Sequence, residues 1–316
     1  MKPADVAAFG GKILDAVEGA IVGKRTVLEK MLLAILCDGH VLIEDYPGLA
    51  KTLMAKSFAA ALGCTFKRVQ FTPDLLPADI TGTYIFDRKA SEFVLRKGPV
   101  FTNVLLADEI NRAPPKTQAA LLEAMQERQT TLEGETHALP RPFIVFATQN
   151  PIEYEGTYPL PEAQVDRFLM RIDIGYPTRE QEKEVLDRRR ARKMEEVQIP
   201  TVGDPEAVLT MQAAVEEVHV DDDVERYIVE VVARTREHSQ VEVGASPRGS
   251  LALMKLGRAS AALRGRDYVV PDDVKGVAVE ALAHRVLLKP DPWIKGVRTA
   301  SIVREVLAAV PVPKVE

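Results

Sequence analysis

The segment that decides the fold is Asp45-Tyr46-Pro47-Gly48-Leu49-Ala50-Lys51-Thr52, followed by Leu53, which separates an apolar run from an amphipathic one. A loop that ends in Lys-Thr between a strand and a helix is typical of phosphate binding. Lys51 would then neutralise the phosphates, and the Thr52 hydroxyl would hold Mg²⁺. Asp45 and Ala50 replace both glycines of the usual pattern. Neither replacement forbids the loop, because Asp tolerates the left-handed region and Ala adds only one methyl group.

Paired carboxylates strengthen the phosphate-loop interpretation, since the loop alone fits an ordinary strand-to-helix turn equally well. Residues 104–107 form an apolar run typical of a buried strand, and Asp108 and Glu109 follow it directly. Open parallel sheets bind ligands beyond the carboxyl ends of their strands. Asp108 is therefore predicted to hold Mg²⁺, and Glu109 to orient and deprotonate the water that attacks the γ-phosphate.

A third apolar run, residues 143–148, is predicted to bring Asn150 to the same edge of the sheet. The Asn150 side chain could hydrogen-bond both the γ-phosphate and the attacking water. An Asx-turn before Pro151 is the simpler explanation of this residue taken by itself.

Two arginines complete the candidate site. Arg248 follows Ser246-Pro247 and falls in the first turn of a predicted helix, where a cation opposes the helix dipole unless an anion compensates it. An ATP phosphate would be such an anion. Arg167, taken alone, is better explained by pairing with a nearby acid such as Asp166 or Glu162.

The first half of the chain alternates apolar runs with helical periodicity, which predicts a parallel sheet covered by helices on both faces. Helical spacing is clearest at residues 28–37, 52–62 and 116–127. Two hairpins are expected in addition, at about 82–97 and 129–139. The predicted strands are 40–44, 65–71, 104–107, 143–148 and 169–174.

The sequence pattern changes after residue 177, from alternating strand and helix patterns to helix patterns alone. Thr178-Arg179-Glu180-Gln181 matches a capping box, and the remainder is predicted to be helical. We therefore expect an α/β core over residues 1–177 and a smaller all-α domain over 178–316. The predicted helices of the second domain are 179–192, 205–217, 222–238, 247–263 and 271–286.

Composition excludes several classes of protein. The chain has 316 residues, 46% of them hydrophobic and 28% charged, which is neither a disordered chain nor a membrane bundle. The N-terminus lacks the basic region and apolar run of a signal peptide, so we expect a cytoplasmic protein with no membrane partner. Cys37 and Cys64 lack metal-ligand spacing and are expected to be reduced thiols.

Together these segments resemble an AAA+ ATPase of the MoxR family. The most specific matches are residues 108–113 (Asp-Glu-Ile-Asn-Arg-Ala), 147–151 (Ala-Thr-Gln-Asn-Pro) and 160–168 (Leu-Pro-Glu-Ala-Gln-Val-Asp-Arg-Phe). The resemblance covers nearly the whole chain, from Ile21-Val22-Gly23, which is similar to the segment that cups adenine, to Ser246-Pro247-Arg248. Both predicted hairpins fall where the helix-2-insert clade of this superfamily carries its own.

The resemblance implies a P-loop NTPase core with a helical lid, ATP and Mg²⁺ as ligands, and a role for each motif residue. Val22, Gly23 and residues 45–53 would contact the nucleotide. Lys51 and Thr52 match Walker A, Asp108 and Glu109 Walker B, Asn150 sensor 1, Arg248 sensor 2, and Arg167 the arginine finger that reaches the ATP of the neighbouring subunit.

The resemblance also implies partners that the residues alone do not indicate. Members of the family form rings, commonly hexamers, with ATP at the subunit interfaces. They are thought to remodel or mature client proteins, often together with a protein that bears a von Willebrand factor A domain. The sequence does not identify the client.

Two other functions stay open at this level. The glycine-poor loop also suits a nucleotide-gated binding module that hardly hydrolyses ATP. A nucleic-acid motor is less favoured, because the net charge is −5 and the basic run at 187–193 is surrounded by acids.

Overall fold

A five-stranded parallel sheet forms the centre of the first half of the chain in this computed structural model, which describes residues 1–89, 91–150 and 156–313. The strand order is β2-β5-β8-β1-β9. All five predicted strands are confirmed, with ends that shift by at most two residues. They are β1 (Val41–Glu44), β2 (Phe66–Gln70), β5 (Val104–Asp108), β8 (Ile144–Gln149) and β9 (Met170–Ile172).

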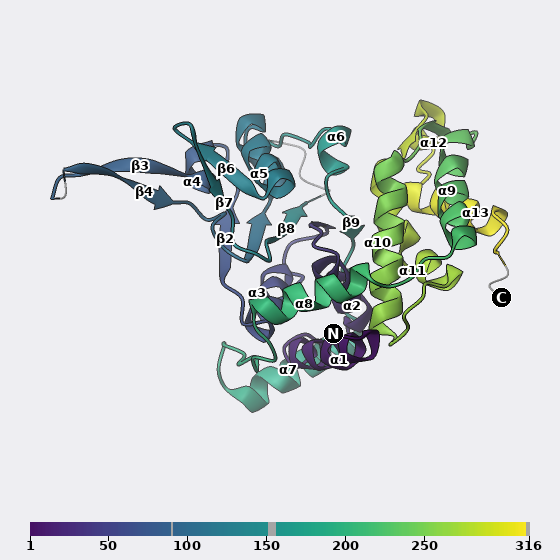
Figure 1. The fold of residues 1–316 in the computed structure, drawn as a ribbon, viewed down its shortest axis with the longest axis horizontal. Coiled ribbons are helices and arrows are strands. Elements are labelled where there is room, and N and C mark those ends of the chain that lie inside the picture. The colour runs from purple at the N-terminus through teal and green to yellow at the C-terminus, as the bar shows by residue number, and fades with distance from the viewer. Residues whose placement is uncertain (90, 151–155, 314–316) are drawn as a thin grey trace.

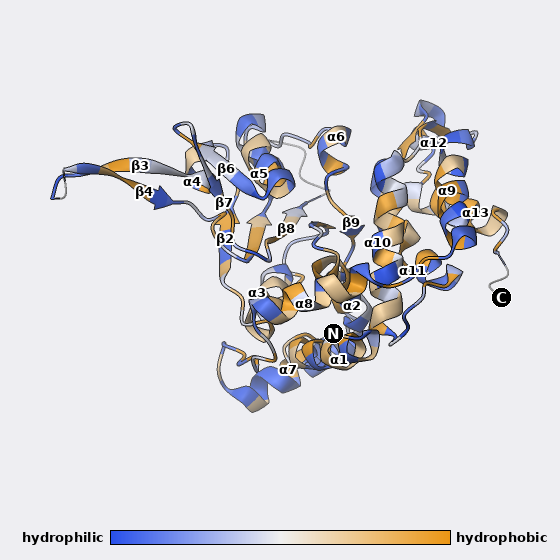
Figure 2. Cartoon of the chain, viewed as in Figure 1, coloured by the Kyte–Doolittle hydropathy of each residue, from blue (hydrophilic) through white to orange (hydrophobic). Residues whose placement is uncertain are grey.

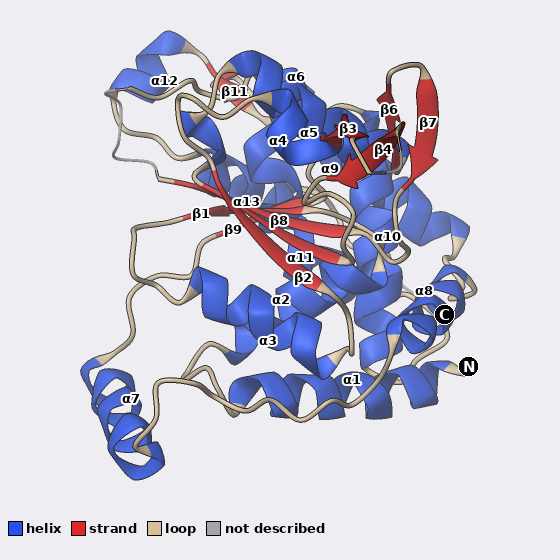
Figure 3. Ribbon diagram, turned by 90° about the vertical axis from the view of Figure 1, so that its left-hand side faces the viewer, coloured by secondary structure: helices blue, strands red, loops and turns tan. Residues whose placement is uncertain are grey.

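Alternate residues of these strands enter two different cores, as expected for a sheet that is buried on both faces. Val41 and Ile43 face one core, whereas Leu42 between them faces the other. Figure 3 shows helices on both sides of the twisted sheet. The first core includes α1 (Pro3–Glu18), α2 (Arg25–Leu36) and α3 (Lys51–Ala61), and the second includes α4 (Pro77–Thr81) and α5 (Pro115–Glu127).

Both predicted hairpins are present. β3 (Gly82–Asp87) pairs with β4 (Glu92–Lys97), and β6 (Gln129–Leu132) pairs with β7 (Glu135–Ala138). The first hairpin projects away from the body of the molecule as an arm (Figure 1). Figure 2 shows hydrophobic residues along this arm, and the paired residues Phe86 and Phe93 near its turn are exposed by 53% and 70%.

The second half is mainly helical, as predicted, and begins with the expected capping box. The Gln181 N–H donates to Thr178 Oγ1 (3.3 Å), and the Thr178 N–H donates to Gln181 Oε1 (2.9 Å). The helices are α7 (Arg179–Arg192), α8 (Pro205–Glu216), α9 (Asp222–Glu237), α10 (Pro247–Leu263), α11 (Pro271–Leu282), α12 (Pro290–Ile294) and α13 (Thr299–Ala309).

Two details of this half differ from the all-α expectation. The helix predicted to reach residue 286 ends at Leu282 and continues as a short 3-10 turn, Ala283–Arg285. Strands β10 (Val241–Val243) and β11 (Leu287–Leu288) then form a small antiparallel pair. Strands of three and two residues are too short to show periodicity in sequence.

The two halves share one hydrophobic core. Residues of α1 and α2 pack in the same cluster as residues of α8, α10 and α11. The Gln212 side chain of α8 donates to the Ile35 carbonyl of α2 at 2.7 Å, and Figure 1 shows α8 beside α2. Helices that precede residue 177 and helices that follow it therefore pack together and hold the second half of the chain against the first. Within the described residues, no helix has the length and apolarity that a bilayer span requires.

Candidate nucleotide site

The loop after β1 takes the shape of a phosphate-binding loop. Gly48 and Ala50 have positive φ values of +82° and +58°, and α3 begins directly afterwards at Lys51. The Lys51 ammonium folds back to donate to the Asp45 carbonyl. Burial lowers the pKa of Lys51, and the nearby carboxylates of Asp45, Asp108 and Glu109 oppose that shift. Backbone N–H groups and one lysine are therefore gathered at a helix start, the arrangement that binds phosphate.

Asp45 has a different role from the glycine that usually occupies its position. It does not adopt a positive φ, so the expectation that Asp is accepted there for its left-handed tolerance is wrong. Its carboxylate instead accepts hydrogen bonds from the backbone N–H groups of Ile174 (2.7 Å) and Gly175 (2.6 Å), beyond β9, and of Tyr46 (2.8 Å). The side chain ties the start of the loop to the neighbouring strand.

Asp108, the last residue of β5, and Glu109, which follows it, lie at the carboxyl edge of the sheet, as predicted. The buried Thr148 hydroxyl at the end of β8 donates to Asp108 Oδ1 at 2.6 Å and accepts the Glu109 N–H at 2.8 Å. Glu109 itself has a left-handed backbone, with φ +57° and ψ +50°. Such backbone strain concentrates at functional sites, and here Thr148 holds it in place.

Two residues of β2 complete the surroundings of these acids, and the sequence analysis did not find them. Arg68 forms an ion pair with Asp108 at 2.6 Å, and the Gln70 amide donates to Glu109 Oε2 at 2.6 Å. Arg112 forms a second contact with Glu109, at 3.0 Å. The signal was present, because Arg68 and Gln70 alternate on one face at the carboxyl end of a predicted parallel strand.

These groups line one cavity of about 510 Å³. Its oxygen donors include the Thr52 hydroxyl and the Asp108 carboxylate, which are the hard ligands that Mg²⁺ prefers. The residues present therefore fit a Mg²⁺·nucleotide. The lining residues are Pro47, Gly48, Leu49, Ala50, Lys51, Thr52, Leu53, Arg68, Gln70, Asp108, Glu109, Thr148 and Asn150.

Several predicted site residues lie outside this cavity. Val22 is buried, and the Gly23 carbonyl accepts a hydrogen bond from the Gln181 side chain of α7 (3.2 Å). Tyr46 stacks on Tyr176 with ring centroids 5.5 Å apart. Pro151, which the Asx-turn alternative needs, lies outside the described residues.

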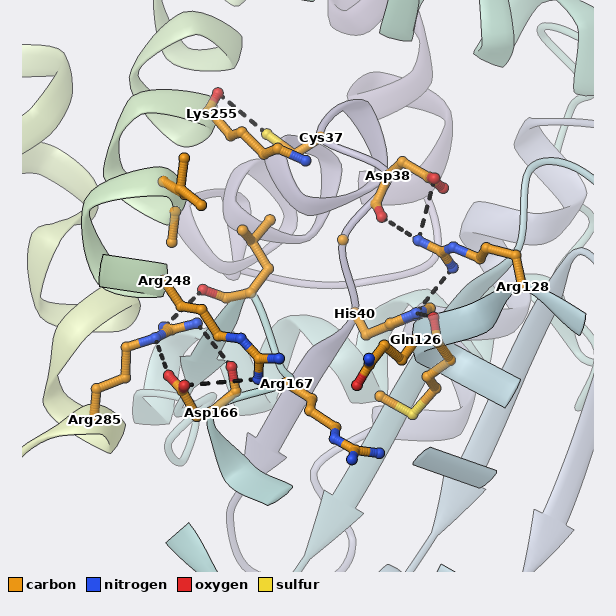
Figure 4. Close-up of a pocket in the computed structure, with 15 residues that line it drawn as sticks. Cys37, Asp38, His40, Gln126, Arg128, Asp166, Arg167, Arg248, Lys255 and Arg285 are labelled. Atoms are coloured by element: carbon orange, nitrogen blue, oxygen red, sulfur yellow. Dashed lines mark hydrogen bonds and ion pairs between the residues drawn. The ribbon is translucent and has the colours of Figure 1, made fainter. Parts of the chain in front are cut away.

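Arg167 and Arg248 meet in a second cavity, of about 250 Å³, to which the phosphate loop contributes no lining residue (Figure 4). Arg248 lies in the first turn of α10, as predicted, and its guanidinium is 3.7 Å from Asp166. The anion beside this helix start is therefore a side chain of the same chain. Arg167 follows α6 (Glu162–Val165), and its guanidinium has no hydrogen bond or ion pair within the part of the chain that the structure describes.

Other cations surround this second cavity. The Arg285 guanidinium is almost fully buried and pairs with Asp166 at 2.8 Å. Burial lowers its pKa to about 10, and the charge of Asp166 opposes the shift. Arg128 pairs with Asp38 at 3.2 Å, whereas the Lys255 ammonium makes no ion pair among the described residues. The cavity thus holds more positive than negative side chains, and it suits an anion.

Comparison with known proteins finds two family matches, several relatives and a similar solved structure. Residues 40–170 match the ATPase family associated with various cellular activities (AAA), and residues 233–306 match the AAA lid domain. The chain is 46% identical to the protein named Chaperone MoxR1 of Mycobacterium tuberculosis over 95% of this chain and 81% of that protein. It is 34% identical to Protein MoxR of Methylorubrum extorquens, covering 92% and 90% of the two chains. A crystal structure of a candidate ATPase from Cytophaga hutchinsonii has a TM-score of 0.91 and 41% identity, covering 98% of this chain and 97% of that one.

Proposed function

Because this chain belongs to the MoxR family of AAA+ ATPases and is a chaperone-like ATPase of that type, we propose that it hydrolyses Mg²⁺·ATP at sites shared between ring subunits to remodel client proteins or complexes. The observation that carries the shared site is the separation of two cavities. One holds the phosphate loop and both acids, and the other holds Arg167 and Arg248. Each cavity lacks the groups that the other supplies.

Within the first cavity, each residue would have a distinct task. Lys51 and the loop N–H groups would bind the β- and γ-phosphates, and Thr52 and Asp108 would hold Mg²⁺, which supplies charge neutralisation. Asn150 would orient the attacking water. Glu109 would accept a proton from that water. For this step its carboxylate has to leave Gln70 and Arg112, which both contact Oε2.

The second cavity would act on the ATP of a neighbouring subunit. The Arg167 guanidinium has no partner among the described residues and would stabilise the charge that develops on the transferred phosphoryl group. Arg248 would assist it from the lid. A heterologous contact of this kind closes into a ring when the rotation allows, and we propose a hexamer.

The client and any helper protein would bind elsewhere. The arm formed by β3 and β4 offers exposed Phe86 and Phe93, which suit contact with apolar segments of a client. We also propose a von Willebrand factor A domain protein as partner and a cytoplasmic location.

The test is steady-state hydrolysis of ATP with Mg²⁺ and with excess EDTA, alongside nucleotide binding. We expect turnover that requires Mg²⁺. Binding without any turnover under both conditions would instead support a nucleotide-gated binding module, which the paired state of Glu109 and Asp108 also favours.

A nucleic-acid motor has less support. The basic end of α7 is neutralised locally, because Arg188, Arg189 and Arg190 pair with Glu184, Glu195 and Asp187 at 2.5–2.8 Å. Salt-sensitive binding of DNA or RNA would reverse this judgement.

A further inference from the structure

One guanidinium connects the two acids of the nucleotide cavity. Arg68 Nη2 lies 2.6 Å and Nε 3.1 Å from Asp108 Oδ2, so both donors converge on one oxygen. The same Nη2 is 2.8 Å from Gln70 Oε1, and Gln70 Nε2 is 2.6 Å from Glu109 Oε2. Arg68 thus holds Asp108 directly and Glu109 through Gln70.

Both oxygens of the Asp108 carboxylate accept hydrogen bonds in this arrangement, and Oδ2 accepts two. Its Oδ1 accepts the Thr148 hydroxyl at 2.6 Å, and its Oδ2 accepts Arg68. Thr148 is buried and fixed on a central strand, whereas the Arg68 side chain is 48% exposed on the edge strand β2. A divalent cation at Asp108 would repel the guanidinium, and of the two partners Arg68 is the one that can move.

We propose that Arg68 is a positioning residue, a latch that Mg²⁺ displaces. In the observed arrangement Arg68 neutralises Asp108 and holds Gln70, which donates to Glu109. With Mg²⁺ held at Asp108, Arg68 would leave that carboxylate and lose its hold on Gln70, so that Arg112 would be the remaining contact of Glu109 Oε2 named above. This inference rests on the proposed function, in which Asp108 holds the metal.

The experiment measures the affinity of the full chain for a fluorescent ATP analogue, once with Mg²⁺ and once with EDTA. The readout is the dissociation constant with EDTA divided by the dissociation constant with Mg²⁺. This ratio reports how strongly the metal promotes binding, independently of turnover. For Arg68→Ala we expect this ratio to rise about five- to tenfold over the wild type, because Mg²⁺ no longer has to displace a partly buried ion pair. Arg68→Lys, which keeps the charge without the fork, should lie between the two. Arg96→Ala on the arm is the matched control and should leave the ratio unchanged.

The other outcomes overturn the inference in distinguishable ways. An unchanged ratio with normal affinities means that the Arg68 contact is only structural. A ratio that falls because affinity with Mg²⁺ is lost means that Arg68 binds the nucleotide directly. A wild type that binds no nucleotide under either condition refutes the proposed function itself. Thermal melting of each variant confirms that the measured chain is folded.

Discussion

The two cavities of this molecule differ in which charged side chains line them and in whether those side chains form ion pairs or hydrogen bonds. In the nucleotide cavity Asp108 and Glu109 are both paired, and Lys51 is turned onto the loop backbone. In the second cavity Arg167 has no partner within the described residues, and the cations there outnumber the acids. The residues of the first cavity fit a metal and phosphates, and the second cavity contains an arginine that pairs with no acid among the described residues. The difference supports our proposal that the two cavities are halves of one site.

Glu109→Gln should have the largest effect. The amide cannot accept a proton, so turnover should fall by about 10²–10⁴-fold while ATP affinity stays close to that of the wild type. Hydrolysis and nucleotide binding are measured on the same preparation. Glu123→Gln on the exposed face of α5 is the matched control. Unchanged turnover in Glu109→Gln would mean that the acids of the first cavity do not perform the chemistry.

Arg167→Ala should reduce turnover by about 10³-fold with little loss of ATP affinity, because its guanidinium would act on transition-state charge. The decisive measurement mixes this variant with Glu109→Gln. If the two residues act across an interface, random mixing of equal amounts should restore about a quarter of the sites. Arg179→Ala, on the exposed surface of α7, serves as the control. No recovery in well-mixed assemblies would place both residues in one subunit's site.

Arg248→Ala should cost less than Arg167→Ala, on the order of 10-fold in turnover, since part of its charge is already compensated by Asp166. Comparing both single variants with the double variant shows whether they act on one anion. A loss equal to that of Arg167→Ala would show that the Asp166 contact does not weaken Arg248.

Asp45→Gly restores a glycine of the usual loop pattern and should nevertheless destabilise the chain, by about 1–3 kcal/mol, because the Ile174 and Gly175 N–H groups lose their acceptor. Thermal unfolding measures the change. Asp45→Asn keeps one acceptor oxygen and should lose less. A more stable Asp45→Gly chain would contradict the anchoring role of this carboxylate.

Ala50→Gly restores the other glycine and should have the smallest effect, with the opposite sign. Relief of the left-handed strain at φ +58° should raise stability by roughly 0.5–1 kcal/mol, less than the full strain because glycine also gains freedom in the unfolded chain. The same thermal unfolding measurement applies. Destabilisation here would show that the methyl group makes a packing contribution larger than the strain.

The sequence located the strands and the loop residues because both depend on local signals. Alternating apolar runs marked all five strands, and the acids after β5 were found because the carboxyl ends of parallel strands share an edge. Arg68 and Gln70 were not predicted, although they also lie toward the carboxyl end of a parallel strand. Their role depends on the pairing of β2 with β5, which brings them beside Asp108 and Glu109. The anchoring role of the Asp45 carboxylate could not be predicted either, because the Ile174 and Gly175 N–H groups that it binds lie about 130 residues away in the sequence.

By itself, the sequence determined the α/β core, the helical second half and the motif residues of the first cavity, since periodicity, capping and strand-end chemistry are written in neighbouring residues. Only the tertiary structure decided which of those residues meet. It placed Arg167 and Arg248 together beside Asp166 and away from Lys51, and it packed α1 and α8 into one core across residue 177. Such contacts depend on how distant helices pack against the sheet, and local pattern does not encode that arrangement.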